Sequence, residues 1–154
     1  MSSYAFDRGS QAGRDMGPPS DPTGATITVT CSSSIGTATI GQWVCEHRDP
    51  YISRMVRFRR VVAGTDVNHW WDDGANAIAF SRGDKGFVAV NRESTPVTAT
   101  IATGLPAGSY CDVLTGGRNG TSCAGTSVTI GATGTVSITL GPTSAIAIHA
   151  GTRL

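Results

Sequence analysis

The sequence predicts an α+β chain that is mainly β, in which an antiparallel β-sandwich follows a long loop and a single helix. Three observations lead to this fold class. Seven short stretches of alternating apolar and polar residues lie between positions 77 and 149, separated by turn residues. One stretch before them, 49–62, has the spacing and the start signal of a helix. The four cysteines form two local pairs, as in small loop-rich domains.

Composition limits the size of the fold and its partners. The 154 residues suit one main hydrophobic core. Only 15% are charged, and 12 Lys and Arg nearly cancel 11 Asp and Glu, so no strong field exists to collect nucleic acid or anionic lipid. No apolar run reaches the roughly 18 residues that span a bilayer, and the residues after Met1 do not resemble a signal peptide. We therefore expect no nucleic acid, no membrane and no export signal in this chain.

The first 43 residues are predicted to form a long loop. They are rich in Gly, Pro, Ser and Thr, and only 25–29 alternate like a strand. Irregular stretches of this length are uncommon inside a compact small domain. The loop is therefore expected to run over the surface of a larger body.

The helix is predicted to begin at Asp49 and Pro50, because Asp caps orphan amides and Pro suits the first helical position. It should run to about Val62, with Gly64 as a stop. One face collects side chains at a three- and four-residue spacing: Ile52, Met55, Val56 and Arg59.

The predicted strands all follow the helix. They are 77–81, 86–91, 97–102, 110–114, 127–130, 135–140 and 145–149. The turns at 83–86 and 131–134 are the best hairpin signals. Seven short strands of this kind favour an antiparallel sandwich.

The cysteines are predicted to form two disulfides, Cys31 with Cys45 and Cys111 with Cys123, each closing a loop rich in Gly, Ser and Thr. Each would stabilise the fold by about 3 kcal/mol and requires an oxidising compartment, which conflicts with the missing export signal. A zinc site is disfavoured, because neither spacing matches a C-x2-C pair and the three histidines do not cluster with the cysteines.

Several strings in collinear order resemble α-amylases of the animal and Streptomyces type. They are Trp43-Val44-Cys45-Glu46-His47-Arg48, Met55-Val56-Arg57-Phe58-Arg59, Trp70-Trp71-Asp72-Asp73-Gly74, the stretch 79–87, the stretch 103–113, and Ile146-Ala147-Ile148-His149-Ala150. Together they cover nearly the whole chain. The loop between Cys31 and Cys45 is longer than its counterpart in the animal enzymes, and the helix is unusually rich in Arg.

The resemblance implies that residues 1–76 are the end of a catalytic (β/α)8 barrel, comprising a loop and the last helix, and that 77–154 form the Greek-key C-terminal domain. The parent would be an extracellular, retaining endo-glycosidase that cleaves internal α-1,4-glucosidic bonds of starch and glycogen. Its catalytic carboxylates are expected upstream of Met1, and its calcium and chloride sites mostly or wholly outside this chain. We thus expect no catalytic, cofactor-binding or metal residue here, and no activity of this chain alone.

Its own role is then structural support for the missing barrel. The apolar face that the helix would turn toward that barrel is expected to be exposed here, which predicts aggregation or partial unfolding. Two alternatives stay open. One is a starch-binding β-sandwich module, and the other is a truncated gene product in which Met1 is an internal methionine.

Four groups of residues have both a functional and a structural interpretation, and the structural one is favoured for each. Trp70 and Trp71 beside Asp72 and Asp73 resemble a sugar-binding group, but one Trp packing at the barrel–sandwich seam and an Asp-based turn are favoured. Glu46 is expected to cap the helix or bind Arg48, since no second carboxylate can be assigned to it. His149 is expected to be a structural histidine. The helix arginines, which scatter around the axis, are expected to be solvated or to form interdomain ion pairs: Arg54, Arg57, Arg59 and Arg60.

Overall fold

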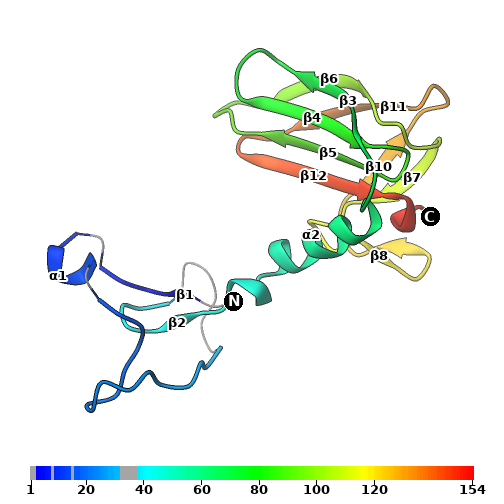
Figure 1. Cartoon of the computed structure of the whole chain (residues 1–154). Helices are drawn as coiled ribbons and strands as arrows, with labels where there is room; N and C mark the ends of the chain where they lie inside the picture. Colours follow the sequence, from blue (N-terminus) through cyan, green and yellow to red (C-terminus); the bar gives the residue numbers. More distant parts are fainter. Residues whose placement is uncertain (1–2, 8, 15, 32–37) are drawn as a thin grey trace. The chain divides into compact units, whose positions relative to one another are not determined.

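The computed structural model describes residues 3–7, 9–14, 16–31 and 38–154 (Figure 1). Met1, which the sequence analysis considered as an internal methionine of a longer protein, lies outside the described residues. So does the part of the loop between Cys31 and Cys45 at 32–37. The chain forms two compact units, Met1–Ser53 and Arg54–Leu154. No helix in the described ranges is long and apolar enough to cross a membrane.

The first unit is mostly loop. Strand β1 (Ser3–Tyr4) pairs with β2 (Trp43–Val44) in antiparallel fashion, and two short helices, α1 (Gln11–Arg14) and η1 (Glu46–Arg48), lie along the chain. The Tyr4 ring packs edge-on against Trp43 at 6.5 Å. Residues 25–29, which alternate like a strand in the sequence, lie in this loop, as predicted. Within the described residues they take part in one isolated bridge, Ser20 to Thr26.

Helix α2 (Pro50–Val61) confirms the predicted start and stop. The Asp49 Oδ1 atom accepts hydrogen bonds from the Tyr51 amide at 2.9 Å and the Ile52 amide at 3.3 Å. Gly64 has φ +76°, the left-handed conformation expected after a helix.

The predicted apolar face of α2 is partly wrong. The side chains that pack into the second unit are Met55, Phe58 and Val62, whereas Val56 is 55% exposed. The spacing from Met55 to Phe58 to Val62 is three and then four residues, so these positions form one stripe. Val56 lies off that stripe and shows a second apolar surface on the same helix.

The second unit is an antiparallel β-sandwich, which confirms the predicted fold class (Figure 1). One sheet has the order β12-β5-β4-β3: Ser144–His149, Gly86–Asn91, Ala77–Arg82 and Val67–Asp72. Two further pairs are β6 (Val97–Ala102) with β11 (Thr135–Leu140), and β7 (Gly108–Cys111) with β10 (Ser127–Ile130). A small hairpin joins β8 (Arg118–Asn119) to β9 (Ser122–Cys123), and η2 (Ala150–Thr152) follows β12. The pairs β5–β12, β6–β11 and β7–β10 are nested, which wraps the chain as in Greek-key sandwiches.

Six of the predicted strands agree with the structure to within about one residue at each end, and the fourth does not. Strand β7 ends at Cys111, because the Gly116 amide bonds the Val113 carbonyl in a turn. Strand β3 was not predicted at all. Its pairing with β4 shifts between Asn68 and Trp71, and His69 has φ +49°, so this bulged segment does not alternate regularly.

Strands β4, β5 and β12 of the four-stranded sheet are covered on both faces, whereas the edge strand β3 is mostly exposed. One face and the strands opposite it enclose the main core: Ala79, Phe87, Ala89, Ile101, Leu105, Tyr110, Val128, Ile130, Val136, Leu140 and Ile148. The other face packs Val88 and Ala147 against Phe58 and Val62 of α2. A Cβ on Gly86 would lie 2.5 Å from Val62 Cγ1, so glycine allows the helix to approach the sheet. The predicted domain boundary at residue 76 stays a prediction.

Candidate functional site: an aromatic surface and two disulfide-closed loops

Trp70 is the most exposed of the aromatic side chains on the sandwich. It is 58% exposed, and its ring stacks on Phe80 at 5.9 Å with 11° between the planes. The indole N–H donates to Asp72 Oδ2 at 3.0 Å, which holds the ring flat against its neighbour. A flat, open aromatic face of this kind can stack against a sugar ring. Phe80 was not among the sequence candidates, since the register of β3 on β4 was needed to place it beside Trp70.

The two aspartates form the turn that was favoured, while the packing of one Trp at a barrel–sandwich seam stays a prediction. Trp71 packs against the main core. Asp72 Oδ1 accepts from the Gly74 amide at 3.1 Å, and Asp73 Oδ1 accepts from the Ala75 and Ala77 amides at 2.9 and 3.0 Å. These bonds lower the pKa of the Asp73 carboxyl, most of all the one from Ala75. The pair forms an Asx-type turn.

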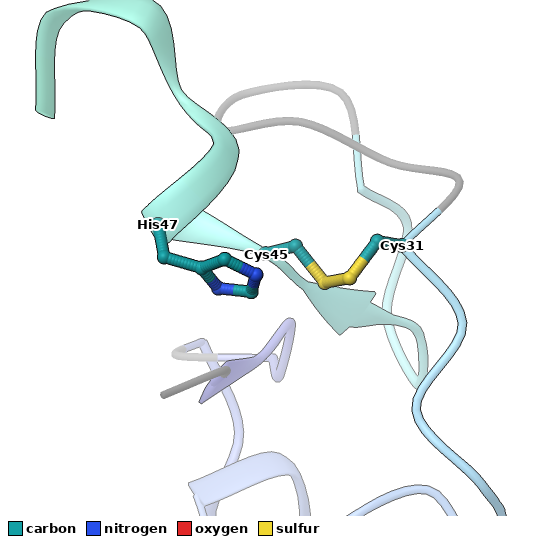
Figure 2. A group of neighbouring side chains, drawn as sticks. All are labelled: Cys31, Cys45 and His47. Carbon is teal, nitrogen blue, oxygen red and sulfur yellow. A yellow bond between two sulfur atoms is a disulfide. The ribbon is translucent and has the colours of Figure 1, made fainter. Parts of the chain in front are cut away.

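Cys31, Cys45 and His47 come together in the first unit (Figure 2). Their possible ligand atoms lie within 4.8 Å of one another. The two sulfurs, however, are joined in a disulfide with a Cα–Cα distance of 5.4 Å, so neither is a thiolate that could bind a metal. This group therefore offers a metal one imidazole at most.

Glu46 bonds Ser3 rather than Arg48. Its carboxylate accepts from the Ser3 amide at 3.1 Å and also from the Ser3 hydroxyl. The hydroxyl bond is the largest cause of a lowered pKa of the Glu46 carboxyl. A carboxyl that is ionised more easily than usual suits an anchor between η1 and β1 and is the opposite of what a general acid needs.

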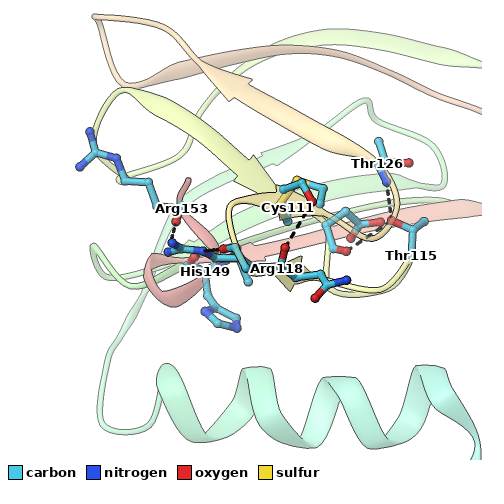
Figure 3. Close-up of a disulfide and its surroundings, with 12 residues drawn as sticks. Cys111, Thr115, Arg118, Thr126, His149 and Arg153 are labelled. Atoms are coloured by element: carbon cyan, nitrogen blue, oxygen red, sulfur yellow. Dashed lines mark hydrogen bonds between the residues drawn. A yellow bond between two sulfur atoms is a disulfide. The ribbon is translucent and has the colours of Figure 1, made fainter.

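The second disulfide joins Cys111 to Cys123 and closes the loop that carries β8 and β9 (Figure 3). Inside the loop, Thr115 Oγ1 accepts from the Thr126 amide at 2.9 Å. Arg118 donates from Nη1 to the Arg153 carbonyl at 2.7 Å, which ties the loop to the segment after η2. The loop is thus held by a covalent bond and by side-chain hydrogen bonds.

His149 is a structural histidine, as expected. Its Nδ1 accepts from the Gly151 amide at 3.1 Å and caps η2, and its ring lies 6.1 Å from the Phe58 ring of α2. Figure 3 shows the imidazole on the side of the strand that faces this helix. Burial lowers the pKa of the imidazole, because the charged form loses hydration.

Four of the described carboxyls have a shifted pKa. Retaining glycosidases need a carboxyl acid with a raised pKa about 5 Å from a carboxylate nucleophile. Where a carboxyl pKa is shifted among the described residues, the shift is downward: Asp7, Asp21, Glu46 and Asp73. The buried Asp112 accepts from two amides, at Leu114 and Ala147. These groups serve turns, caps and anchors.

An antiparallel β-sandwich with a helix packed on one face defines an all-β class of domain. Residues 69–151 match the family model described as "Alpha amylase, C-terminal all-beta domain". The chain belongs to this family.

Its relatives include α-amylases from three animal groups. The chain is 41% identical to the α-amylase of Pecten maximus, 41% to pancreatic alpha-amylase 2a5 of Mus musculus and 44% to the α-amylase of Tribolium castaneum. These matches cover 99%, 100% and 100% of this chain but only 30%, 31% and 30% of the relatives. The chain therefore spans about three tenths of their length.

Solved structures give the same result. The chain is similar to α-amylase I of Eisenia fetida, in a mutant crystallised with maltohexaose, with a TM-score of 0.81 and 38% identity. The wild-type enzyme gives a TM-score of 0.79 and 36% identity. Both comparisons cover 97% of this chain and 31% of the other.

Proposed function

We propose that this chain is the C-terminal β domain of an α-amylase, together with the loop and helix before it. The whole enzyme would hydrolyse internal α-1,4-glucosidic bonds of starch and glycogen outside the cell, with retention of configuration. Residues 1–76 would belong to the end of its catalytic barrel and 77–154 to the sandwich. The observation that carries the proposal is the match along the full chain to α-amylases of which it spans only 30–31%.

In this proposal the chain supports catalysis without performing it. The catalytic carboxylates and the calcium and chloride sites would be supplied by the rest of the enzyme. Two observations support this division: the shifted carboxyl pKa values are low, and the first cysteine pair is a disulfide. The exposed Val56 and Ile52 on α2 supply an apolar surface that the missing barrel would cover.

A chimera tests the proposal. The matching C-terminal region of the Tribolium castaneum α-amylase is replaced by this chain, and starch hydrolysis is compared among the chimera, the unaltered enzyme, a version lacking the region, and the 154-residue chain alone. We expect activity in the chimera and none in the chain alone. We also expect the shortened enzyme to melt at a lower temperature. Starch hydrolysis by the purified chain alone would refute the proposal.

A second candidate, a starch-binding module, rests on the open Trp70 face stacked on Phe80. Electrophoresis of the chain through a starch-containing gel tests it. Retardation that is lost in Trp70→Ala and kept in Tyr51→Ala, an equally exposed aromatic control, would support binding by this surface. Equal mobility with and without starch would exclude it.

A further inference from the structure

A small cavity of the second unit brings three arginines together. It has a volume of about 170 Å³, and its lining includes Arg54 and Arg57 of α2, Arg118 of β8 and His149 of β12. No Asp or Glu lines it. Three guanidinium groups, which stay charged at any ordinary pH, thus meet at one concave spot of a chain whose net charge is only +1. We call this cavity the arginine pocket.

Two of these arginines are held in place by backbone carbonyls. Arg54 Nη1 donates to the Leu114 carbonyl at 2.6 Å. Arg118 donates from Nε to the Gly120 carbonyl at 2.8 Å and from Nη1 to the Arg153 carbonyl, as Figure 3 shows. A guanidinium has five N–H donors, so each side chain keeps donors for a ligand while its position is fixed. Carbonyl oxygens orient these groups without neutralising them.

Arg57 is different from its neighbours. Among the residues that the structure describes, it has no hydrogen bond and no ion pair, although it lines the same cavity. The acidic group next in the chain to the pocket wall, Asp112, is buried and already accepts from two backbone amides through Oδ1. The positive charge of the pocket is therefore not balanced by a carboxylate that lines it.

We propose that the arginine pocket binds a small inorganic oxyanion of the phosphate or sulfate type. Guanidinium groups pair with such oxygens through two parallel N–H bonds, which a fixed Arg54 and Arg118 can supply. The cavity is much larger than the roughly 30 Å³ that one water molecule occupies, so an oxyanion enters with some of its water. The bound ion would bridge α2 to the disulfide-closed loop and stabilise their contact. The proposal does not depend on the function proposed above.

The test is a titration of the whole 154-residue chain with inorganic phosphate at constant ionic strength, balanced with sodium chloride. Calorimetry measures the dissociation constant, and the melting temperature is followed in parallel. We expect saturable binding and a melting temperature that rises with phosphate. Arg57→Gln is expected to weaken binding at least about tenfold, as the loss of a charged hydrogen bond does. Its effect on folding should be small, because Arg57 is exposed and has no hydrogen bond or ion pair among the described residues.

Arg60→Gln is the matched control. It removes the same charge from the same helix at an exposed position outside the pocket and is expected to change the dissociation constant less than about twofold. Arg118→Gln should weaken binding like Arg57→Gln. The proposal is overturned if phosphate shows no saturable binding, if chloride alone gives the same stabilisation, or if Arg60→Gln weakens binding as much as Arg57→Gln.

Discussion

Replacing Phe58 with Ala tests whether α2 is an integral part of the sandwich unit. The side chain is 4% exposed and packs with Val62 against Val88, Val113 and Ala147. Burying a Phe side chain contributes about 1.5–3 kcal/mol, and the cavity left by its removal adds to the loss. We therefore expect Phe58→Ala to lower the free energy of unfolding by about 3–5 kcal/mol. Urea denaturation of the 154-residue chain, followed by circular dichroism, measures it.

Val56→Ala is the control on the same helix. Val56 is 55% exposed and lies off the packed stripe, so its truncation should cost less than about 0.5 kcal/mol. Both changes put Ala into a helix, so helix propensity does not explain a difference. Equal and small effects of the two substitutions would show that α2 does not pack on the sheet, and the second hydrophobic cluster would have to be rejected.

Three further predictions concern the same unit. Gly86→Ala should cost about 1–3 kcal/mol, because its Cβ would overlap helix side chains, whereas Gly131→Ala, whose Cβ has room, should cost far less in the same denaturation assay. Replacing Cys111 and Cys123 by Ser should cost about 3 kcal/mol, seen as a lower melting temperature than that of the unaltered chain. Because the folded state lowers the pKa of His149, the unfolded state binds more protons just below the ordinary imidazole pKa of 6.5. Stability should fall as pH drops through that region, and His149→Gln should flatten this part of a pH series of melting temperatures.

The strands could be predicted where apolar and polar residues alternate and glycine marks the turn that follows. Strand β5 was predicted correctly although it does not alternate. Its run of apolar residues reflects its place in the sheet, where it is covered on both faces. Strand β3 was not predicted because its bulge, with His69 at positive φ, breaks the regular alternation of apolar and polar residues. The segment 25–29 also alternates, yet among the described residues it forms only the isolated bridge of Ser20 with Thr26. The alternation of residues along one segment does not reveal which strands will lie beside it to form a sheet.

Some candidate sites follow from local sequence, and others form only when distant segments meet in the folded chain. The disulfide partners are close in sequence, so spacing alone pointed to them, and the turn at Asp72 and Asp73 follows from local side-chain chemistry. The stacking of Trp70 on Phe80 depends on a hairpin register. The arginine pocket depends on three elements that meet only in the folded chain, so a list of charges along α2 suggested a scattered, solvated set.

The two roles considered for Trp70 make different physical demands on it. Phe80, on which it stacks, belongs to the sheet face that packs against α2, so the open indole extends an already buried apolar cluster. A ring placed in this way is more typical of an interface than of an isolated sugar platform. In the chimeric enzyme, Trp70→Ala should then lower the melting temperature by several degrees and leave starch retardation unchanged. Lost retardation with an unchanged melting temperature would instead assign Trp70 to starch binding.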